Sequence, residues 1–282
     1  MNPSLPKNSN PTRVQIVAVL NMSPDSFFKA SSRTSFEEAL AYSRQLIEAG
    51  ADILDIGGES TRPATPFHQK QGPLVEVSED EELQRIIPLI KALRAEFPSQ
   101  KLSVDTRRTQ IAQEALSLGV HFINHVCDSV DPQLARVLSE FPESRLVLCH
   151  MRGQPQNMQA GNFHEGPIVP YLREWFETQI ALLTKHGVSA SQIILDPGIG
   201  FGKRKPDQDL EILKGIPELK ALGFPVFIGL SRKSFMGQIL NKKAEDLLPA
   251  TLVMNTYALL QGADYIRVHD VREHRDLVSL LP

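Results

Sequence analysis

Apolar stretches alternate with amphipathic stretches along nearly the whole chain. Segments such as "QIILD" at 192–196 and "FIGLS" at 227–231 are apolar at successive positions, which is typical of parallel strands buried on both faces. The stretches between them contain helix signals, such as a capping box of Ser78 and Glu81. The pattern predicts strands at 14–22, 51–58, 101–106, 121–126, 145–150, 192–198, 225–231 and 263–270, and helices at 35–50, 78–97, 109–119, 132–141, 169–187, 207–222, 249–262 and 272–281.

Eight units of one strand and one helix therefore follow each other. Strands that alternate with helices predict a parallel sheet. Eight such units in about 270 residues predict closure into a (β/α)8 TIM barrel rather than an open sheet. We expect an α/β protein with a single domain at 14–282, preceded at 1–13 by a polar tail that is expected to be disordered. The long segments at 59–77 and 151–168 follow strands, where such barrels carry their function.

Composition excludes several classes of protein. The 282 residues are 41% hydrophobic and 22% charged, with a net charge of −3, which is ordinary for a soluble globular protein. No basic excess suggests a nucleic-acid partner, and no apolar run approaches the roughly 18 residues of a membrane span. Cys127 and Cys149 are too few for a disulfide framework or a structural zinc site. The start of the chain does not resemble a signal peptide, so we expect a cytoplasmic protein.

Polar residues gather where the predicted strands end. In a (β/α)8 barrel these ends form one rim, which carries the active site. Carboxylates suit adjacent N–H groups of a flat heterocycle, whereas cationic or protonatable side chains suit a phosphate or diphosphate. The rim offers the first type at Asp105, Asn124 and Asp196, and the second at Arg62, Lys233, Arg267 and His269. Together they predict a ligand that is a heterocycle carrying a diphosphate.

Five of these residues also have a purely structural interpretation, among them His269, which taken alone is more often structural than catalytic. Asp105 can cap the helix after it, and Asn124 can satisfy backbone groups of the barrel. Asp196 can shape the loop at Pro197, and Arg267 can form a salt bridge at the rim. A whole cluster of this kind is harder to explain as structure, because charges at a rim cost free energy unless they are paired.

The segment "LDPGIGFGK" at 195–203 resembles a phosphate-binding loop but fits neither the dinucleotide fingerprint nor the P-loop spacing. We expect its glycines to let the chain turn tightly over the site, with recognition supplied by Asp196 and Phe201. The run from Lys203 to Lys205 is interpreted as a solvated loop face, so Lys203 has only a weak claim to a function.

Six motifs resemble those of the dihydropteroate synthase family, and the resemblance spans residues 14–280. They are "LNMSPDSF" (20–27), "DIGGESTRP" (55–63), "SVDT" (103–106), "LDPGIGFGK" (195–203), "GLSRKS" (229–234) and "IRVHD" (266–270). The resemblance implies a pterin-binding (β/α)8 barrel and a transferase of folate biosynthesis. Its reaction joins 6-hydroxymethyl-7,8-dihydropterin diphosphate to p-aminobenzoate, giving 7,8-dihydropteroate and diphosphate. A Mg²⁺ ion bound with the diphosphate and a homodimer are implied as well.

The resemblance also implies a role for each matched residue. The pterin-binding set is Asp105, Asn124, Val126, Met151, Asp196, Phe201, Gly229 and Lys233. The diphosphate-binding set is Asn21, Thr61, Arg62, Arg267 and His269, with Asn21 also the magnesium ligand. The p-aminobenzoate side, which sulfonamides mimic, is Phe27, Thr61, Pro63, Lys233 and Ser234. The residues expected to act in catalysis are Asn21, Arg62, Lys233, Arg267 and His269.

The chemistry predicts a dissociative, SN1-like substitution. An aromatic amine is neutral at neutral pH, so its lone pair attacks without a strong general base, and the sequence offers no obvious one. The difficult step is the loss of diphosphate, which magnesium and a cationic cluster stabilise.

Three departures from the family pattern stand beside two alternatives. One of them is a second loop that is longer than usual and has Ala64 where Gly is common. The first loop reads "SFFKASSRTS", where an Asp-Gly or Gly-Gly stretch is usual, and His125 follows Asn124, where Asp is frequent. One alternative is a pterin-binding methyltransferase of the same barrel group, which has no need of a diphosphate clamp. The other is a non-catalytic pterin-binding homologue, for which the altered first loop is the only support.

Overall fold

A computed structural model of the chain describes residues 13–22, 33–59, 77–153, 163–204 and 206–281. Strands and helices alternate along it, as the hydrophobic pattern predicts. The strands are β1 (Gln15–Asn21), β2 (Ile53–Gly57), β3 (Lys101–Asp105), β4 (Phe122–Cys127), β5 (Arg145–His150), β6 (Ile193–Asp196), β7 (Phe227–Ile228) and β8 (Tyr265–Val268). The helices are α1 (Arg33–Glu48), α2 (Glu79–Glu96), α3 (Thr109–Ser117), α4 (Pro132–Glu140), α5 (Ile168–Lys185), α6 (Asp207–Lys214), α7 (Ile216–Lys220), α8 (Ser234–Leu240), α9 (Leu248–Leu260) and α10 (Val271–Leu280), with short 3-10 turns η1 (Ala190–Gln192) and η2 (Ala244–Asp246).

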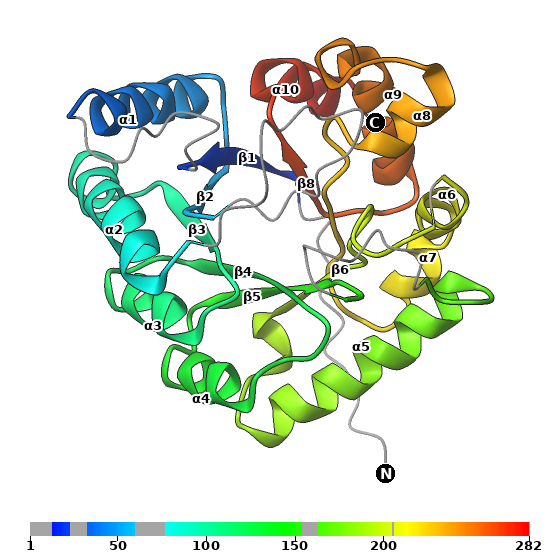
Figure 1. Ribbon diagram of the computed structural model, residues 1–282, viewed down its shortest axis with the longest axis horizontal. Helices are drawn as coiled ribbons and strands as arrows, with labels where there is room; N and C mark the ends of the chain where they lie inside the picture. Colours follow the sequence, from blue (N-terminus) through cyan, green and yellow to red (C-terminus); the bar gives the residue numbers. More distant parts are fainter. Residues whose placement is uncertain (1–12, 23–32, 60–76, 154–162, 205, 282) are drawn as a thin grey trace.

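The strands form one parallel sheet that closes on itself. Its order is β6-β5-β4-β3-β2-β1-β8-β7. A parallel bridge between Leu195 and Val226, with the Leu195 amide donating to the Pro225 carbonyl at 2.9 Å, joins the two ends. The helices surround the strands as an outer ring (Figure 1). The predicted (β/α)8 barrel is confirmed.

Apolar side chains fill the barrel below the rim. A large buried cluster lies between the strands and the helices. A separate cluster draws one residue from each of seven strands: Val17, Ile53, Phe122, Val147, Ile194, Phe227 and Tyr265. Inward-facing residues of neighbouring strands form such layers in barrels of this kind. The interior is therefore a packed plug, and the polar site lies above it.

The capping box at the start of α2 is confirmed. The Glu81 amide donates to Ser78 Oγ at 3.3 Å, and the Ser78 amide donates to the Glu81 carboxylate at 3.0 Å. Two orphan amides of the first turn are satisfied in this way. The helix thus begins at a defined point directly after the segment 60–76, which is outside the described residues.

The predictions were wrong at two helices. The single helix expected at 207–222 is two, α6 and α7, separated at Gly215. A Cβ on Gly215 would lie 2.4 Å from Val169 Cγ2 of α5, so only glycine permits this close approach. The sequence pattern also missed α8, which begins at Ser234 directly after Lys233.

Some expectations are not tested by the fold. The predicted tail at 1–13 lies outside the described residues except for Arg13. The barrel elements run from Gln15 to Leu280, and the domain bounds 14–282 stay a prediction. Among the described helices, none combines the length and apolarity needed to span a membrane. The cytoplasmic location stays a prediction.

Candidate active site

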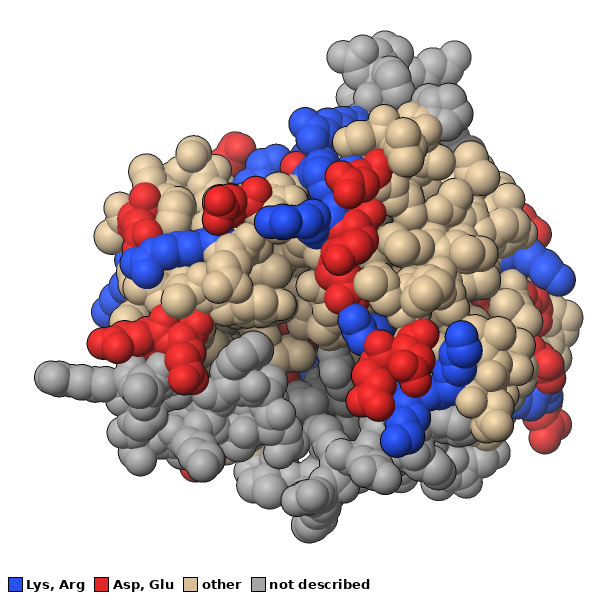
Figure 2. Space-filling model, turned by 90° about the horizontal axis from the view of Figure 1, so that it is seen from above, with Lys and Arg blue, Asp and Glu red and all other residues tan. Residues whose placement is uncertain are grey.

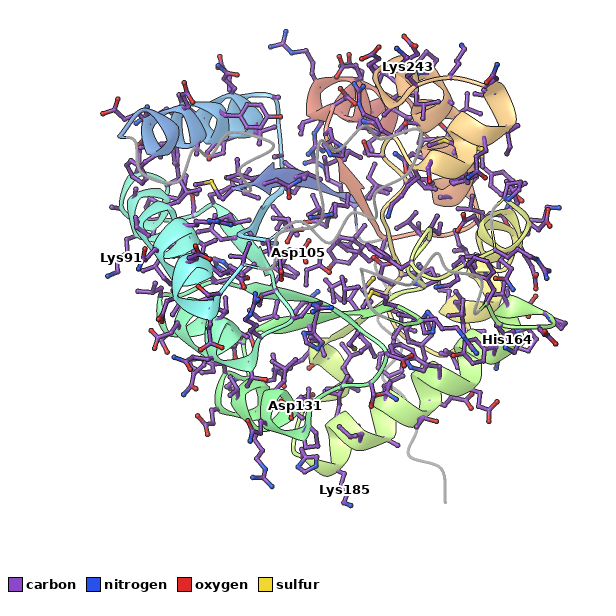
Figure 3. All side chains as sticks on the ribbon, viewed as in Figure 1. Lys91, Asp105, Asp131, His164, Lys185 and Lys243 are labelled. Carbon is purple, nitrogen blue, oxygen red and sulfur yellow. The ribbon has the colours of Figure 1, made fainter. Side chains whose placement is uncertain are left out.

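The strand register places the first polar residues of the rim at one level. Asn21 pairs with Gly57, Gly57 with Asp105, and Asp105 with Asn124 across four adjacent strands. Figure 3 shows Asp105 near the middle of the ring of helices, whereas the labelled Lys91, Asp131 and Lys185 lie at its periphery. The parallel barrel therefore brings these side chains together at its mouth, as the sequence predicts.

A carboxylate without an assigned role joins this group. Asp55 of β2 has no exposed surface. It accepts hydrogen bonds from Ser103 Oγ at 2.5 Å, from Asn124 Nδ2 at 3.1 Å and from Arg267 Nε at 2.6 Å. A buried carboxylate needs such donors, because burial without them is costly. Asp55 is thus the residue that orients both Asn124 and Arg267. The signal that could have identified it is a carboxylate in the middle of the otherwise apolar strand β2.

Arg267 lies against the acidic group rather than apart from it. Its Nη2 donates to Asp105 Oδ2 at 2.8 Å, and its side chain remains 21% exposed. Burial lowers the pKa of Arg267, but the carboxylates of Asp55 and Asp105 raise it by more than burial lowers it. The net pKa is raised, so the guanidinium stays charged. A Cβ on Gly229 would lie 4.0 Å from Arg267 Cβ, so the glycine flanks the arginine. The salt bridge left open by the sequence is present, and it fixes this cation at the rim.

Asp105 is a carboxyl group with a strongly perturbed proton affinity. Burial raises the pKa of Asp105 to about 7, the charge of Arg267 opposes this rise, and the neighbouring Asp55 adds to it. Two carboxylates that share one guanidinium cannot both be fully compensated. Asp105 therefore titrates close to neutral pH, which is a common feature of functional carboxyl groups.

Asp196 shapes the loop that follows β6. Its Oδ1 accepts a hydrogen bond from the Gly198 amide at 2.8 Å. Burial raises the pKa of Asp196, while the Gly198 hydrogen bond and the charge of Lys233 lower it. The register pairs Asp196 with Cys149 of β5. Asp196 therefore has the structural role in the loop that the sequence left open. Its carboxylate nevertheless lies at the same rim as Asp105.

An apolar wall completes this side of the mouth. Val126, Cys149 and Met151 form a buried cluster, and the half-buried Phe201 packs against it. The Lys233 ammonium lies 4.2 Å from the centroid of the Phe201 ring, which is a cation–π contact. The structure therefore brings together Val126, Met151, Phe201 and Lys233, all four expected at the pterin.

The loops after β7 and β8 hold each other. His269 Nδ1 lies 2.8 Å from Ser231 Oγ. Arg232 makes a bidentate ion pair with Asp270, at 3.0 Å and 2.7 Å. Arg232 does so with a φ of 56°, a left-handed conformation that is uncommon for a side chain of its size. The pair positions Lys233 on one side and His269 on the other. Neither Arg232 nor Asp270 was assigned a role from the sequence.

Four predicted site residues lie outside the described residues: Phe27, Thr61, Arg62 and Pro63. Arg108 connects the two described ends that flank 60–76. It forms ion pairs with Glu59, at 3.1 Å, and with the buried Glu82, and it donates to the Val77 carbonyl.

The remaining predicted residue, Ser234, is buried at the first position of α8.

The glycine loop at 197–203 is not a phosphate cradle. Gly198, Gly200 and Gly202 all have positive φ, at 69°, 81° and 61°. The Gly198 amide is bound by Asp196, and the Gly200 amide donates to the buried Asp209 at 2.8 Å. A phosphate-binding loop presents such amides to its ligand, whereas here two of them are used inside the protein.

The interpretation of Lys203 as part of a solvated loop face is wrong. This residue was expected on a solvated face, but the side chain has no exposed surface. Burial lowers the pKa of Lys203 to about 8, and the neighbouring Cys149 and Asp209 oppose that shift. Charge runs are usually exposed, but the fold buries Lys203 and leaves its neighbour Arg204 exposed.

Comparison with known proteins agrees with this geometry. The family model described as "Pterin binding enzyme" matches residues 17–269. A dihydropteroate synthase of Synechocystis sp. is 38% identical over 261 residues, which cover 92% of this chain and 86% of that protein. The structure of Yersinia pestis dihydropteroate synthase with a sulfonamide drug complex aligns with a TM-score of 0.84 and 33% identity, covering 96% of this chain and 93% of that chain. The Xanthomonas albilineans dihydropteroate synthase in complex with 7,8-dihydropteroate aligns with a TM-score of 0.81 and 29% identity, covering 97% and 96% of the two chains. The chain therefore belongs to the dihydropteroate synthase family of pterin-binding enzymes.

Proposed function

We propose that the chain catalyses the reaction after which its family is named. It transfers the dihydropterinylmethyl group of 6-hydroxymethyl-7,8-dihydropterin diphosphate to the amine of p-aminobenzoate, and it releases diphosphate. The relative from X. albilineans was solved with 7,8-dihydropteroate, the product of this reaction. A chain of this family acts as a transferase, and the arrangement at the rim supports the same substrates.

One observation carries the proposal for the pterin. Asn124 Nδ2 donates to Asp55, which orients the amide and leaves its Oδ1 buried. Within the described residues that oxygen has no hydrogen-bond partner. Buried acceptors are rarely left unsatisfied, so an N–H group of a ligand is the natural partner. The carboxylates of Asp105 and Asp196 on either side suit the other N–H groups of a pterin edge.

The flat ring of the pterin fits the apolar wall. Val126, Met151 and Phe201 present apolar surface beside the polar edge, and Gly229 leaves space next to Arg267. The Lys233 ammonium over the Phe201 ring places a positive charge at the same point. Small-molecule sites commonly combine such a wall with a few placed polar groups.

Loss of diphosphate is the step that the cations would assist. Arg267 is held at the rim by Asp55 and Asp105, and His269 is oriented by Ser231. Preorganised donors of this kind stabilise charge that develops on a leaving group. The amine of p-aminobenzoate then attacks as a neutral nucleophile, in an SN1-like order. Arg62 and Thr61 are proposed to contribute from outside the described residues.

A Mg²⁺ ion fits only as a partner of the diphosphate. Among the described residues, no group of three or more His, Cys, Asp or Glu side chains could hold a metal. Mg²⁺ commonly takes one or two protein oxygens and substrate phosphates, and keeps several waters. Asn21 ends β1 at the level of Asp105, and its Oδ1 lies 3.3 Å from the point where a Gly57 Cβ would stand. Asn21 is the proposed ligand, and the bound ion would neutralise charge on the departing diphosphate.

The second substrate is proposed to bind where α8 begins. Lys233 and Ser234 occupy this point, next to the Phe201 ring. Phe27, Thr61 and Pro63 are proposed to complete this side. The p-aminobenzoate carboxylate is an anion, so a lysine at its edge is a suitable partner.

We further propose a homodimer that uses α8 and α9. Five large apolar side chains of these helices are exposed: Ile239, Leu240, Val253, Tyr257 and Leu260. Val253 is 66% and Leu260 is 64% exposed. On the side where Figure 1 places α8 and α9, Figure 2 shows a broad area without Lys, Arg, Asp or Glu. Apolar patches of this kind mark interaction surfaces, and a second copy of the chain is the occupant that family resemblance favours.

The decisive experiment incubates the purified chain with dihydropterin diphosphate, Mg²⁺ and p-aminobenzoate. We expect equal amounts of dihydropteroate and diphosphate. Tight pterin binding without either product would favour the non-catalytic homologue, and methyl transfer to a corrinoid protein would favour the methyltransferase. Positional isotope exchange in the diphosphate without p-aminobenzoate tests the SN1-like order. Absence of bridge-to-nonbridge scrambling would contradict it.

A further inference from the structure

Lys203 is the most deeply buried cation among the described residues, and its ammonium group is fully engaged. Nζ lies 2.8 Å from His150 Nδ1, 3.1 Å from the Gly198 carbonyl and 2.9 Å from the Phe201 carbonyl. An ammonium has three N–H donors, so each hydrogen has one acceptor. A lysine with no exposed surface and a full set of partners is a built feature of the fold rather than a loop side chain.

The three partners belong to two segments that the site needs together. Gly198 and Phe201 are the ends of one turn, in which the Phe201 amide donates to the Gly198 carbonyl at 3.0 Å. His150 is the last residue of β5, next to Cys149 and Met151 in the wall. The ammonium therefore ties the turn after β6 to the end of β5. The Phe201 ring leaves this turn and packs on the same wall.

Close backbone packing reinforces the tie. A Cβ on Gly198 would lie 1.8 Å from the His150 carbonyl oxygen, and one on Gly202 would lie 2.3 Å from the Arg152 carbonyl oxygen. The turn thus lies directly on the chain after β5, with no room for side chains between them. Lys203 supplies the polar contacts at this junction, and the glycines supply the close approach.

The three contacts survive a change of protonation. Burial lowers the pKa of His150 well below its usual value, with the charge of Lys203 adding to the effect, so its imidazole is neutral. A charged Lys203 donates to His150 Nδ1. A neutral Lys203 keeps two donors for the carbonyls, and its lone pair accepts from Nδ1 in the other imidazole tautomer. The tie is therefore expected to persist across neutral and mildly alkaline pH.

We propose that Lys203 is a positioning residue for the pterin. It holds the Phe201 ring against the Val126–Cys149–Met151 wall, and it acts on the substrate only through that ring and the loop beside Asp196. The proposal rests on the proposed function, because it concerns the same pterin site. It predicts that loss of the ammonium affects pterin binding selectively and leaves p-aminobenzoate binding nearly unchanged.

The test is Lys203→Met, which keeps the length and apolar bulk but removes the three polar contacts. Lys220→Met is the matched control. Lys220 Nζ likewise has several polar partners, the Gly262 carbonyl at 2.7 Å and Asp264 Oδ1 at 2.6 Å, but it lies at the start of β8, at the opposite end of the barrel. Both variants are expected to lower the melting temperature. Only Lys203→Met should raise the dissociation constant for dihydropterin diphosphate, by about 10-fold to 100-fold.

A double-mutant cycle identifies the route of the effect. Phe201→Leu removes the ring, so Lys203→Met should add less than about twofold in its presence if Lys203 acts through Phe201. Full additivity, an unchanged dissociation constant, or an equal change for both substrates would each overturn the proposal. If Lys203→Met fails to fold, Lys203→Gln, which keeps a donor, enters the same cycle with the same criteria. Calorimetric binding of dihydropterin diphosphate needs no turnover, so absent activity in the wild type contradicts the proposed function without deciding the role of Lys203.

Discussion

Replacement of Asp55 by Asn separates the charge of this residue from its hydrogen bonds. The amide oxygen can take the place of Oδ2, which accepts from Asn124 and Arg267. The amide nitrogen then faces Ser103 Oγ and can donate to it, because a hydroxyl also accepts. The variant therefore keeps the network and removes one of two carboxylates around a single guanidinium.

The expected result is a lower pKa for Asp105. Its pKa is about 7 because of burial, which the charge of Arg267 opposes and the charge of Asp55 supports. Two like charges about 5 Å apart interact by about 3 kcal/mol at an effective dielectric constant of about 20. Even half of that energy corresponds to about one pKa unit. Burial persists in the variant, so the pKa of Asp105 should fall by about one unit or more and yet stay above its ordinary value.

The assay is the dissociation constant for dihydropterin diphosphate, measured by calorimetry across a pH series from about 5 to 9. An ionised Asp105 is the better acceptor for a pterin N–H group, so binding should weaken as pH falls through the pKa of Asp105. In Asp55→Asn this acid limb should move to lower pH by about one unit.

Stability distinguishes the charge from the network. Exchange of a charged for a neutral acceptor should lower the free energy of unfolding by about 1 kcal/mol. Asp55→Ala, which leaves Asn124, Ser103 and Arg267 without this acceptor, should lower it by about 3 kcal/mol or more. An acid limb that stays in place or moves to higher pH in Asp55→Asn would refute the reasoning, whatever the change in affinity.

Three further predictions follow from single contacts. The folded-state pKa of Asp105 is about 7, above its ordinary value of 3.8. The folded protein therefore binds an extra proton between these values, and the stability of the wild type should fall as pH rises through that window. Asp105→Asn should show a weaker slope of melting temperature against pH, and an identical slope would contradict the assignment. Gly198→Ala should lower the free energy of unfolding in a urea titration by about 3 kcal/mol or more, since its Cβ would meet a backbone carbonyl at 1.8 Å. Gly119→Ala, at a similar positive φ of 81° but with its nearest atom at 3.7 Å, should lower it by about 1 kcal/mol; equal losses would show that φ alone matters. Arg232→Lys cannot keep the bidentate pair with Asp270, so the specific activity should fall about 10-fold, and wild-type kinetics would remove the positioning role of that pair.

The local pattern of apolar and polar residues was sufficient to predict the strands and most of the helices. Buried parallel strands are nearly continuous apolar runs, and capping residues such as Ser78 mark where helices begin, so both are visible in a short window. The rim followed from one topological rule, because every strand of a parallel barrel ends on the same side. Asp105, Asn124 and Asp196 could therefore be grouped without knowledge of a single contact.

The partners of these residues could not be predicted in the same way. Arg267 binds Asp55 across 212 positions of sequence, and no local window relates the two. The sequence sorted rim residues by charge into an acidic and a cationic group, whereas the structure interleaves them. Opposite charges at a partly buried rim lower their free energy by pairing, so a separation by charge type is the less stable arrangement.

The loop "LDPGIGFGK" shows why residue type alone misleads. Glycines that alternate suggest amides turned toward an anion, but Asp196 and Asp209 already accept from Gly198 and Gly200. Lysine beside arginine suggests solvent, but the fold buries Lys203 between the turn and the end of β5. Both results have one cause, since a turn pressed against a neighbouring backbone must satisfy its own polar groups. Charge that is needed inside to hold such a turn is not available to a phosphate, which is why diphosphate binding is proposed for Asn21, Arg62, Arg267 and His269 rather than for this loop.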